Sequence, residues 1–280
     1  MTLQRQTIAV EGIPVHLIEA GDGPPVLLLH GWPTHSGLYR NILPVIAPYR
    51  RAIAIDLPGF GASGKPQDAS YSFRFFDRVL DGVLDALHVS DVGLVVHDLG
   101  GPIGMHWATQ NIGRVRELVM LNTVVFPDMS WMVKAFVLST MVPGIRRMLS
   151  SPAGIRASMR FGVVDRSRIN DAVAALYQAP FSDRAARKAL LKTAHSLHPR
   201  GFETITEALP RFTMPVRLIY GEDDRILPDV AKTMARICTI LPHATMTSIP
   251  NCGHFLQEDR PEQVAALLAE FFADAMETPA

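Results

Sequence analysis

The sequence predicts an α/β protein in which a mostly parallel, doubly wound sheet is interrupted by an inserted helical cap. Several short runs are apolar at nearly every position, as strands buried on both faces of a parallel sheet require. Helical patterns lie between several of these runs, which implies right-handed crossover connections. The alternation stops near residue 128 and resumes near residue 212.

The elements follow in order along the chain. Residues 7–19 alternate between apolar and polar around Glu11 and Gly12 and predict an opening hairpin. The apolar runs that predict buried strands are 26–30, 52–57, 92–97, 117–122 and 216–221, and the segment 246–250 precedes the last motif of interest. The helical patterns include 72–88 and 102–110. We therefore assign residues 1–127 and 212–280 to the core and residues 128–211 to the cap.

The predicted cap differs in charge from the core. It carries 13 Lys and Arg against 6 Asp and Glu. This surplus either steers anionic substrates or forms a solvated basic face that packs on the acidic core. The cap methionines either line an adaptable apolar pocket or fill an irregular core. They are Met129, Met132, Met141, Met148 and Met159.

Composition excludes several classes of protein. With 280 residues, 48% of them hydrophobic and 19% charged, the chain can bury one large core, which excludes disorder and fibrous repeats. Lys and Arg together number 27, as do Asp and Glu, so no net field attracts phosphate backbones, and nucleic acid is not expected as a partner. The pattern does not indicate an oligomeric state.

Compartment and cofactor expectations follow from what the chain lacks. Cys238 and Cys252 are too few for a disulfide framework, which fits a reducing compartment. The first ten residues have no apolar signal region, and no run approaches the roughly 18 apolar residues of a membrane span. We expect a soluble, cytoplasmic protein without membrane contact. No dinucleotide fingerprint, P-loop or metal-ligand spacing occurs, so we expect neither cofactor nor metal.

Chemistry-bearing residues follow three of the predicted strands. Asp98 stands between the strand 92–97 and a helix, in the position of the nucleophile in a G-x-S-x-G elbow, with two glycines shortly after it. Asp224 follows the strand 216–221, and His254 follows 246–250. Each residue alone has a plainer interpretation, such as a helix N-cap for Asp98. Their order, nucleophile, acid and histidine, is that of a hydrolytic triad at the carboxyl edge of an open sheet.

Six motifs, taken together, resemble the haloalkane dehalogenase and epoxide hydrolase branch of the α/β-hydrolase family. They span nearly the whole chain and occur in the family's order. The motifs are HGWPTHSGLYRNILP (30–44), DLPGFGASGKP (56–66), HDLGG (97–101), YQAPF (177–181), YGEDDRILP (220–228) and NCGHFLQEDRP (251–261). The first of them and YQAPF are more similar to dehalogenases than to epoxide hydrolases.

The resemblance implies an α/β-hydrolase fold and a cofactor-independent hydrolase. Asp98 attacks an sp3 carbon and forms an alkyl ester, and His254 then activates water while the acid orients it. The family spacing G-E-x-D selects Asp224 as that acid. The backbone N–H groups of Trp32 and Leu99 are expected to form the oxyanion hole. The expected partners are a small apolar substrate and water.

The chain departs from the family at the halide site. Dehalogenases usually carry Trp after the nucleophile and often Asn after the HG pair, whereas this chain has Leu99 and Trp32 there. The Trp32 indole, or Trp131 in the cap, could donate to a halide instead.

Dehalogenation is therefore the first expectation, and two alternatives remain. One is an epoxide hydrolase in which cap residue Tyr177 protonates the opening oxygen, with His195 or His198 as a possible second donor. The other is a ligand-binding homologue that has lost turnover.

Overall fold

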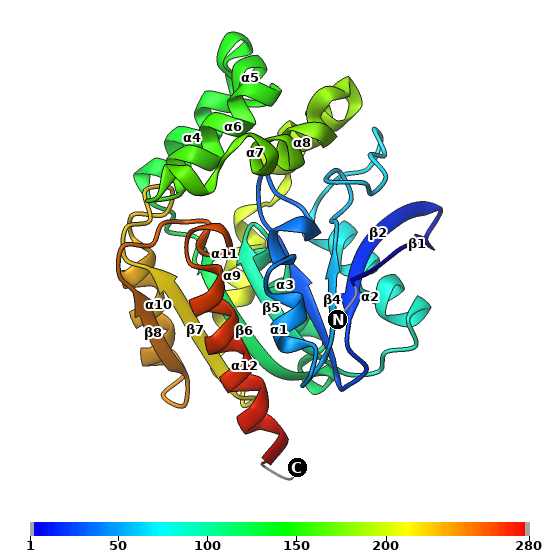
Figure 1. Ribbon diagram of the computed structural model, residues 1–280, viewed down its shortest axis with the longest axis vertical. Coiled ribbons are helices and arrows are strands. Elements are labelled where there is room, and N and C mark those ends of the chain that lie inside the picture. The colour runs from blue at the N-terminus through cyan, green and yellow to red at the C-terminus, as the bar shows by residue number, and fades with distance from the viewer. Residues whose placement is uncertain (1–2, 278–280) are drawn as a thin grey trace.

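The computed structural model describes residues 3–277, and an eight-stranded sheet runs through its core (Figure 1). The strand order is β1-β2-β4-β3-β5-β6-β7-β8. β1 and β2 form the predicted hairpin, and β2 joins the sheet antiparallel to β4, whereas the pairs from β4 to β8 are parallel. The strands are β1 (Gln4–Val10), β2 (Ile13–Ala20), β3 (Pro25–Leu29), β4 (Arg51–Ile55), β5 (Val92–Asp98), β6 (Val115–Thr123), β7 (Val216–Gly221) and β8 (Thr245–Ile249).

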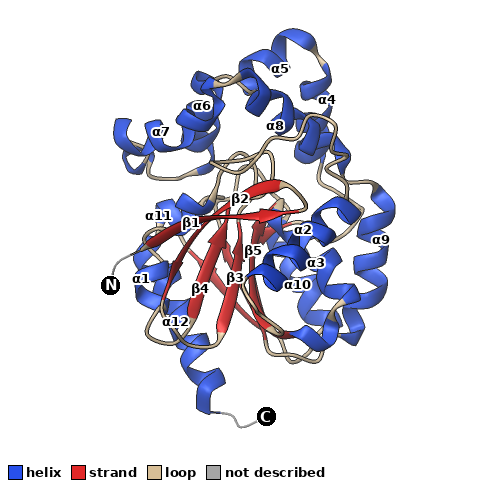
Figure 2. Ribbon diagram, turned by 90° about the vertical axis from the view of Figure 1, so that its right-hand side faces the viewer, coloured by secondary structure: helices blue, strands red, loops and turns tan. Residues whose placement is uncertain are grey.

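Helices cover both faces of this sheet (Figure 2). α1 and α12 pack together on one face, and α2, α3 and α9 pack together on the other. The core helices are α1 (Leu43–Ile46), α2 (Phe73–Ala86), α3 (Gly100–Gln110), α10 (Val230–Ile240), α11 (Leu256–Asp259) and α12 (Pro261–Glu277). The central strands are apolar on both faces for this reason: the side chains of 27–29 in β3 and 94–96 in β5 are fully buried.

The chain between β6 and β7 forms the helical insert. Its helices are α4 (Trp131–Met141), α5 (Pro143–Leu149), α6 (Pro152–Gly162), α7 (Asp171–Gln178), α8 (Arg184–Ser196) and α9 (Pro199–Ala208). Polar side chains fix several helix starts, since Ser130, Asn170 and Asp183 accept hydrogen bonds from backbone N–H groups of the first turns. α4 to α8 lie above one end of the sheet (Figure 1), so the insert covers the edge where the predicted site residues lie.

The cap methionines do not share one role. Met159 is fully buried and fills the core. Met141 and Met148 lie on the surface, so they neither line a pocket nor fill the core. No helix among residues 3–277 has the length and apolar character needed to cross a bilayer.

Candidate active site

Asp98 ends β5 on a sharp turn into α3. Its φ is 49°, in the left-handed region that few residues other than glycine adopt, which projects the side chain away from the sheet. The turn is packed too tightly for a side chain at Gly31 or at Gly100. A Cβ on Gly31 would lie 2.3 Å from Asp98 Cβ, and one on Gly100 would lie 2.5 Å from the His30 carbonyl oxygen. Glycine at both positions therefore lets the HG segment and α3 approach the elbow.

The three residues predicted as a triad come together at this turn. His254 Nδ1 lies 2.8 Å from Asp224 Oδ2, and His254 Nε2 lies 3.2 Å from Asp98 Oδ2. His254 is fully buried and Asp224 nearly so. This arrangement can hold the imidazole in one orientation, with Nε2 toward the nucleophile.

The charges of the triad support one another. Burial opposes the charged form of Asp98, but hydrogen bonding and attraction to His254 outweigh it and hold the pKa of Asp98 below its ordinary value. Burial likewise opposes charge on His254, yet Asp224 and then Asp98 raise its pKa to about 10. At neutral pH the resting site thus contains an ionised nucleophile beside an imidazolium.

Two backbone N–H groups meet the carboxylate of Asp98. Trp32 N–H donates to Asp98 Oδ1 at 2.7 Å, and the N–H of Leu99 also lowers the pKa of Asp98 by hydrogen bonding. Donors that hold a carboxylate oxygen in the resting state can hold the oxyanion that forms at the same atom in a tetrahedral intermediate. This is the geometry expected of an oxyanion hole.

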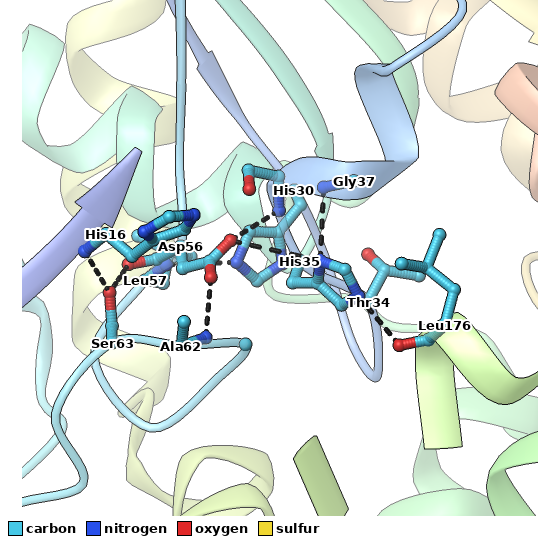
Figure 3. A network of polar contacts seen from close by, with 12 residues as sticks. His16, His30, Thr34, His35, Gly37, Asp56, Leu57, Ala62, Ser63 and Leu176 are labelled. Atoms are coloured by element: carbon cyan, nitrogen blue, oxygen red, sulfur yellow. Dashed lines mark hydrogen bonds and ion pairs between the residues drawn. The ribbon is translucent and has the colours of Figure 1, made fainter. Parts of the chain in front are cut away.

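A buried polar network fixes the loop that carries Trp32 (Figure 3). Asp56, which follows β4, accepts from the backbone N–H groups of Ser36 and Ala62, each at 2.7 Å. His30 Nε2 accepts from Leu57 N–H at 3.0 Å. His35 reaches from the same loop to the Leu176 carbonyl in the cap, at 3.2 Å. Burial is the main cause that lowers the pKa of His30 to about 4. The His30 imidazole is therefore neutral near pH 7.

Asn122 is a site residue that the sequence analysis missed. It lies in a register shift of β6, where Asp98 pairs with Thr123 and Asn122 is skipped. Its side-chain N–H donates to Asp224 Oδ2 at 2.7 Å, and its oxygen accepts from Gly221 N–H at 2.9 Å. Thr123 Oγ1 donates to the Asp98 carbonyl at 2.7 Å. An Asn at the end of an apolar strand is the only sequence signal for this role.

The Trp32 indole does not fit the halide role considered for it. Its N–H donates to the Leu190 carbonyl in α8, at 3.3 Å, while its ring packs edge-on against Phe136 in α4, with ring centres 4.7 Å apart. Leu99 has no side-chain donor. The indole therefore connects the oxyanion loop to the cap, and its hydrogen is already engaged.

Tyr177 likewise has a different environment from the one proposed. It is fully buried, its hydroxyl donates to Glu258, and Arg40 lies 3.4 Å from the hydroxyl oxygen. Burial and the neighbouring Glu258 carboxylate raise its pKa well above the ordinary value. With its proton held by Glu258, Tyr177 anchors α7 to the core rather than facing a substrate oxygen.

The other cap candidates do not converge on the nucleophile either. Trp131, at the start of α4, is 67% exposed and so is not part of a closed pocket wall. His195 Nε2 pairs with Thr140 Oγ1 at 2.7 Å, and His198 caps α9 by accepting from Arg200 N–H. The contacts of these residues are structural.

Asp259 connects the cap to the catalytic loop, and the sequence analysis missed it as well. Its fully buried carboxylate accepts from Gly253 N–H beside His254 and from the N–H groups of Val164 and Asp165 after α6, at 2.7 to 3.0 Å. One side chain thus ties the exit of α6 to the residue before the candidate base.

We expect Asp259→Ala to lower both stability and turnover. Three N–H groups lose their acceptor, which should reduce the free energy of unfolding by about 3 kcal/mol or more, and the freed Gly253 should lower kcat. Urea unfolding and initial rates measure the two effects. Glu262→Ala, at a nearby exposed position, is the control. An unchanged urea midpoint for Asp259→Ala would contradict the role.

A cavity of about 270 Å³ borders the site without touching the nucleophile. The cavity is lined by Thr123 and Leu227, whereas Asp98 and His254 do not line it. Thr123 Oγ1 donates a hydrogen bond to the Asp98 carbonyl, and Leu227 N–H donates one to Asp224 Oδ1. Among the described residues, no group of three His, Cys, Asp or Glu side chains could hold a metal ion.

The chain is similar to several known hydrolases and related enzymes over most of its length. The model of a family described as alpha/beta hydrolase fold matches residues 24–261, which confirms the predicted fold class. "Haloalkane dehalogenase 2" of Mycobacterium tuberculosis is 33% identical, over 92% of this chain and 91% of that protein. The "Cis-3-alkyl-4-alkyloxetan-2-one decarboxylase" of Shewanella oneidensis is 29% identical, over 98% and 90%. The crystal structure of a haloalkane dehalogenase from Bradyrhizobium elkani superposes with a TM-score of 0.83 at 29% identity, over 98% and 99% of the two chains.

Proposed function

Because the chain belongs to the haloalkane dehalogenase-like branch of the alpha/beta hydrolase fold family, we propose that it hydrolyses carbon–halogen bonds of small apolar substrates through an ester on Asp98. The observation that carries the proposal is the elbow carboxylate, whose two oxygens have different partners. Oδ1 is held by the Trp32 N–H, and Oδ2 faces His254. In a displacement mechanism one carboxylate oxygen attacks the substrate while the other stays at the backbone donor, and the different partners of Oδ1 and Oδ2 fit this division of roles.

In the first step Oδ2 attacks the substrate carbon and the leaving group departs with the bonding electron pair. The carboxylate needs no base, because its lowered pKa keeps it ionised at neutral pH. Oδ1 then becomes the carbonyl oxygen of the ester and stays at the backbone N–H of Trp32.

In the second step water attacks the ester carbonyl carbon, and His254 removes one of its protons. The tetrahedral intermediate then collapses by breaking the bond between the carbonyl carbon and Oδ2, so that the alcohol departs with Oδ2 and the second proton of the water, and the Asp98 carboxylate is restored. Esterification removes the negative charge of Asp98, which is one of the causes that raise the pKa of His254. The imidazolium of the resting site can therefore lose its proton once the ester has formed. Asp224 keeps Nδ1 protonated and stabilises the charge that returns as Nε2 takes the proton from water.

A second candidate reaction is the opening of a strained oxygen ring at carbon. It is favoured by the state of the two positions where the resemblance places side-chain donors for a departing halide, since Leu99 has no such donor and the Trp32 indole is engaged by Leu190. The name of the Shewanella relative contains an oxetan-2-one ring. When Asp98 attacks the ring carbon of an oxetan-2-one, the ring oxygen leaves that carbon as part of a carboxylate, so no acid is needed to protonate it. An epoxide would need one, and the Tyr177 hydroxyl hydrogen is held by Glu258.

The test is the intact mass of His254→Ala after incubation with 1-haloalkanes, epoxides and oxetan-2-ones. Without the base, the ester from the first step should accumulate to one per chain. A gain equal to the substrate minus HX supports dehalogenation, and a gain equal to the whole ring supports ring opening. The double variant His254→Ala with Asp98→Asn is the control and should gain nothing. If folded His254→Ala gains no mass from any compound, the proposal fails and the ligand-binding alternative is favoured.

A further inference from the structure

The helix α4 presents an apolar side to solvent. Its exposed positions are 131, 134, 135, 138 and 141, which share one helix face by their spacing, and Lys134 is the only polar residue among them. The exposed apolar surface continues into α5. We define the cap apolar face as Trp131, Leu138, Met141, Val142, Ile145 and Met148, of which the first three and the last are 60 to 67% exposed.

The inward side of the same helix is already used. Phe136 packs on Trp32, and the buried Thr140 pairs with His195 in α8. α4 is therefore docked on the molecule through one side, and residues 3–277 leave its apolar outward side uncovered. Surface helices normally carry polar residues there, and contiguous exposed apolar residues mark an interaction site.

The charge around this face has one sign. Residues 129–164 contain no Asp or Glu and five basic residues. Of these, Lys134, Arg146 and Arg147 are exposed and have no ion-pair partner among residues 3–277, whereas Arg156 pairs with Asp171. α5, which carries two of the arginines, lies at the tip of the cap, at the opposite end of the molecule from the last turns of α12 (Figure 1).

We propose that the cap apolar face docks on the surface of an anionic lipid bilayer, in contrast to the expectation from the sequence that the protein has no membrane contact. Apolar and aromatic side chains flanked by Lys and Arg are the chemistry that enters the headgroup region of such a surface. A second copy of this chain fits less well, because a two-fold interface would bring the same unpaired cations of both copies together. The proposal concerns binding and does not depend on which reaction Asp98 performs.

Docking would place the bilayer one helix away from the candidate site. α4 lies between the cap apolar face and Trp32, whose backbone N–H holds the nucleophile. Apolar substrates concentrate in lipid, so a bound cap would meet them at a higher local concentration than water provides.

The experiment is flotation of the intact protein with vesicles of phosphatidylcholine alone or mixed with phosphatidylglycerol. We expect binding to the mixed vesicles, weakened by salt. Arg146→Gln with Arg147→Gln should weaken it about thirtyfold, and Leu138→Ser with Met141→Ser at least about tenfold. The matched controls are Arg74→Gln with Arg211→Gln and Val45→Ser with Met246→Ser, which change exposed side chains outside α4 and α5 and should bind as the wild type does.

Trp131 gives a second measurement. Of the three tryptophans, Trp107 is fully buried and Trp32 half-buried, so a blue shift of the emission on mixed vesicles reports Trp131, and Trp131→Phe should remove it. No flotation with mixed vesicles, or equal flotation with phosphatidylcholine alone, would overturn the proposal. So would a dimer in sedimentation analysis that Leu138→Ser with Met141→Ser dissociates, since the second copy would then be the occupant.

Discussion

Asp98→Asn is expected to lower kcat by about 10⁴-fold or more and to abolish ester formation. The neutral carboxamide is a far weaker nucleophile than the carboxylate, whose charge His254 and the Trp32 N–H stabilise. The volume hardly changes, so the elbow should stay folded. Single-turnover kinetics and intact mass measure the two effects.

The control for this variant is Asp91→Asn. Asp91 stands just before the same strand, on the surface, where it pairs with Arg116. It should keep full activity. If Asp98→Asn retained more than about one per cent of kcat, Asp98 would not be the nucleophile, and the elbow would have to act only by binding.

Asp224→Asn is expected to lower kcat by a similar factor, about 10⁴-fold. Each carboxylate oxygen of Asp224 accepts two hydrogen bonds. Oδ1 accepts from the N–H groups of Ile226 and Leu227, and Oδ2 from Asn122 and His254. An amide has one NH2 group, which must face two donors in either orientation. In one orientation the NH2 group faces His254, and the imidazole loses its acceptor. In the other it faces the N–H groups of Ile226 and Leu227, and the loop that positions residue 224 is no longer held. In both cases the raised pKa of His254 should fall.

Asp223→Asn separates this effect from a general loss of charge. Asp223 is the adjacent residue and is exposed, so the same substitution there should leave kcat within twofold. Steady-state kinetics between pH 5 and 10 would compare the two. An Asp224→Asn enzyme with wild-type kcat would show that His254 needs no carboxylate to orient it.

The sequence was sufficient to predict the sheet and the residues of the elbow because those features depend on local patterns. Strands such as 94–96 must be apolar on both faces, and Asp98 stands where the strand gives way to a glycine-rich helix start. The order of Asp98, Asp224 and His254 follows from the chain itself. The distances between these three side chains do not follow from the chain alone. Parallel strands bring their carboxyl ends to one edge of the sheet, however, so their proximity could be predicted.

The cap could not be predicted in this way. α4, with the sequence WMVKAFVLSTM, is apolar around most of its circumference, so periodicity does not show which side faces inward. Trp131 was therefore expected at the substrate and lies at the surface instead. Tyr177 was considered as a proton donor in the epoxide hydrolase alternative, but its partner Glu258 is 81 residues away in the chain, and no spacing indicates such a contact. Asn122 and Asp259 were missed because their roles consist of hydrogen bonds to distant backbone groups.

The position of the insert between β6 and β7 has an evolutionary consequence. These strands are adjacent and parallel, so a crossover must connect them whether or not a cap is present. The cap is that obligatory connection made longer, and it occupies one contiguous stretch of the gene. Recombination or insertion there can exchange the cap while the strand order and the positions of Asp98, Asp224 and His254 are inherited unchanged.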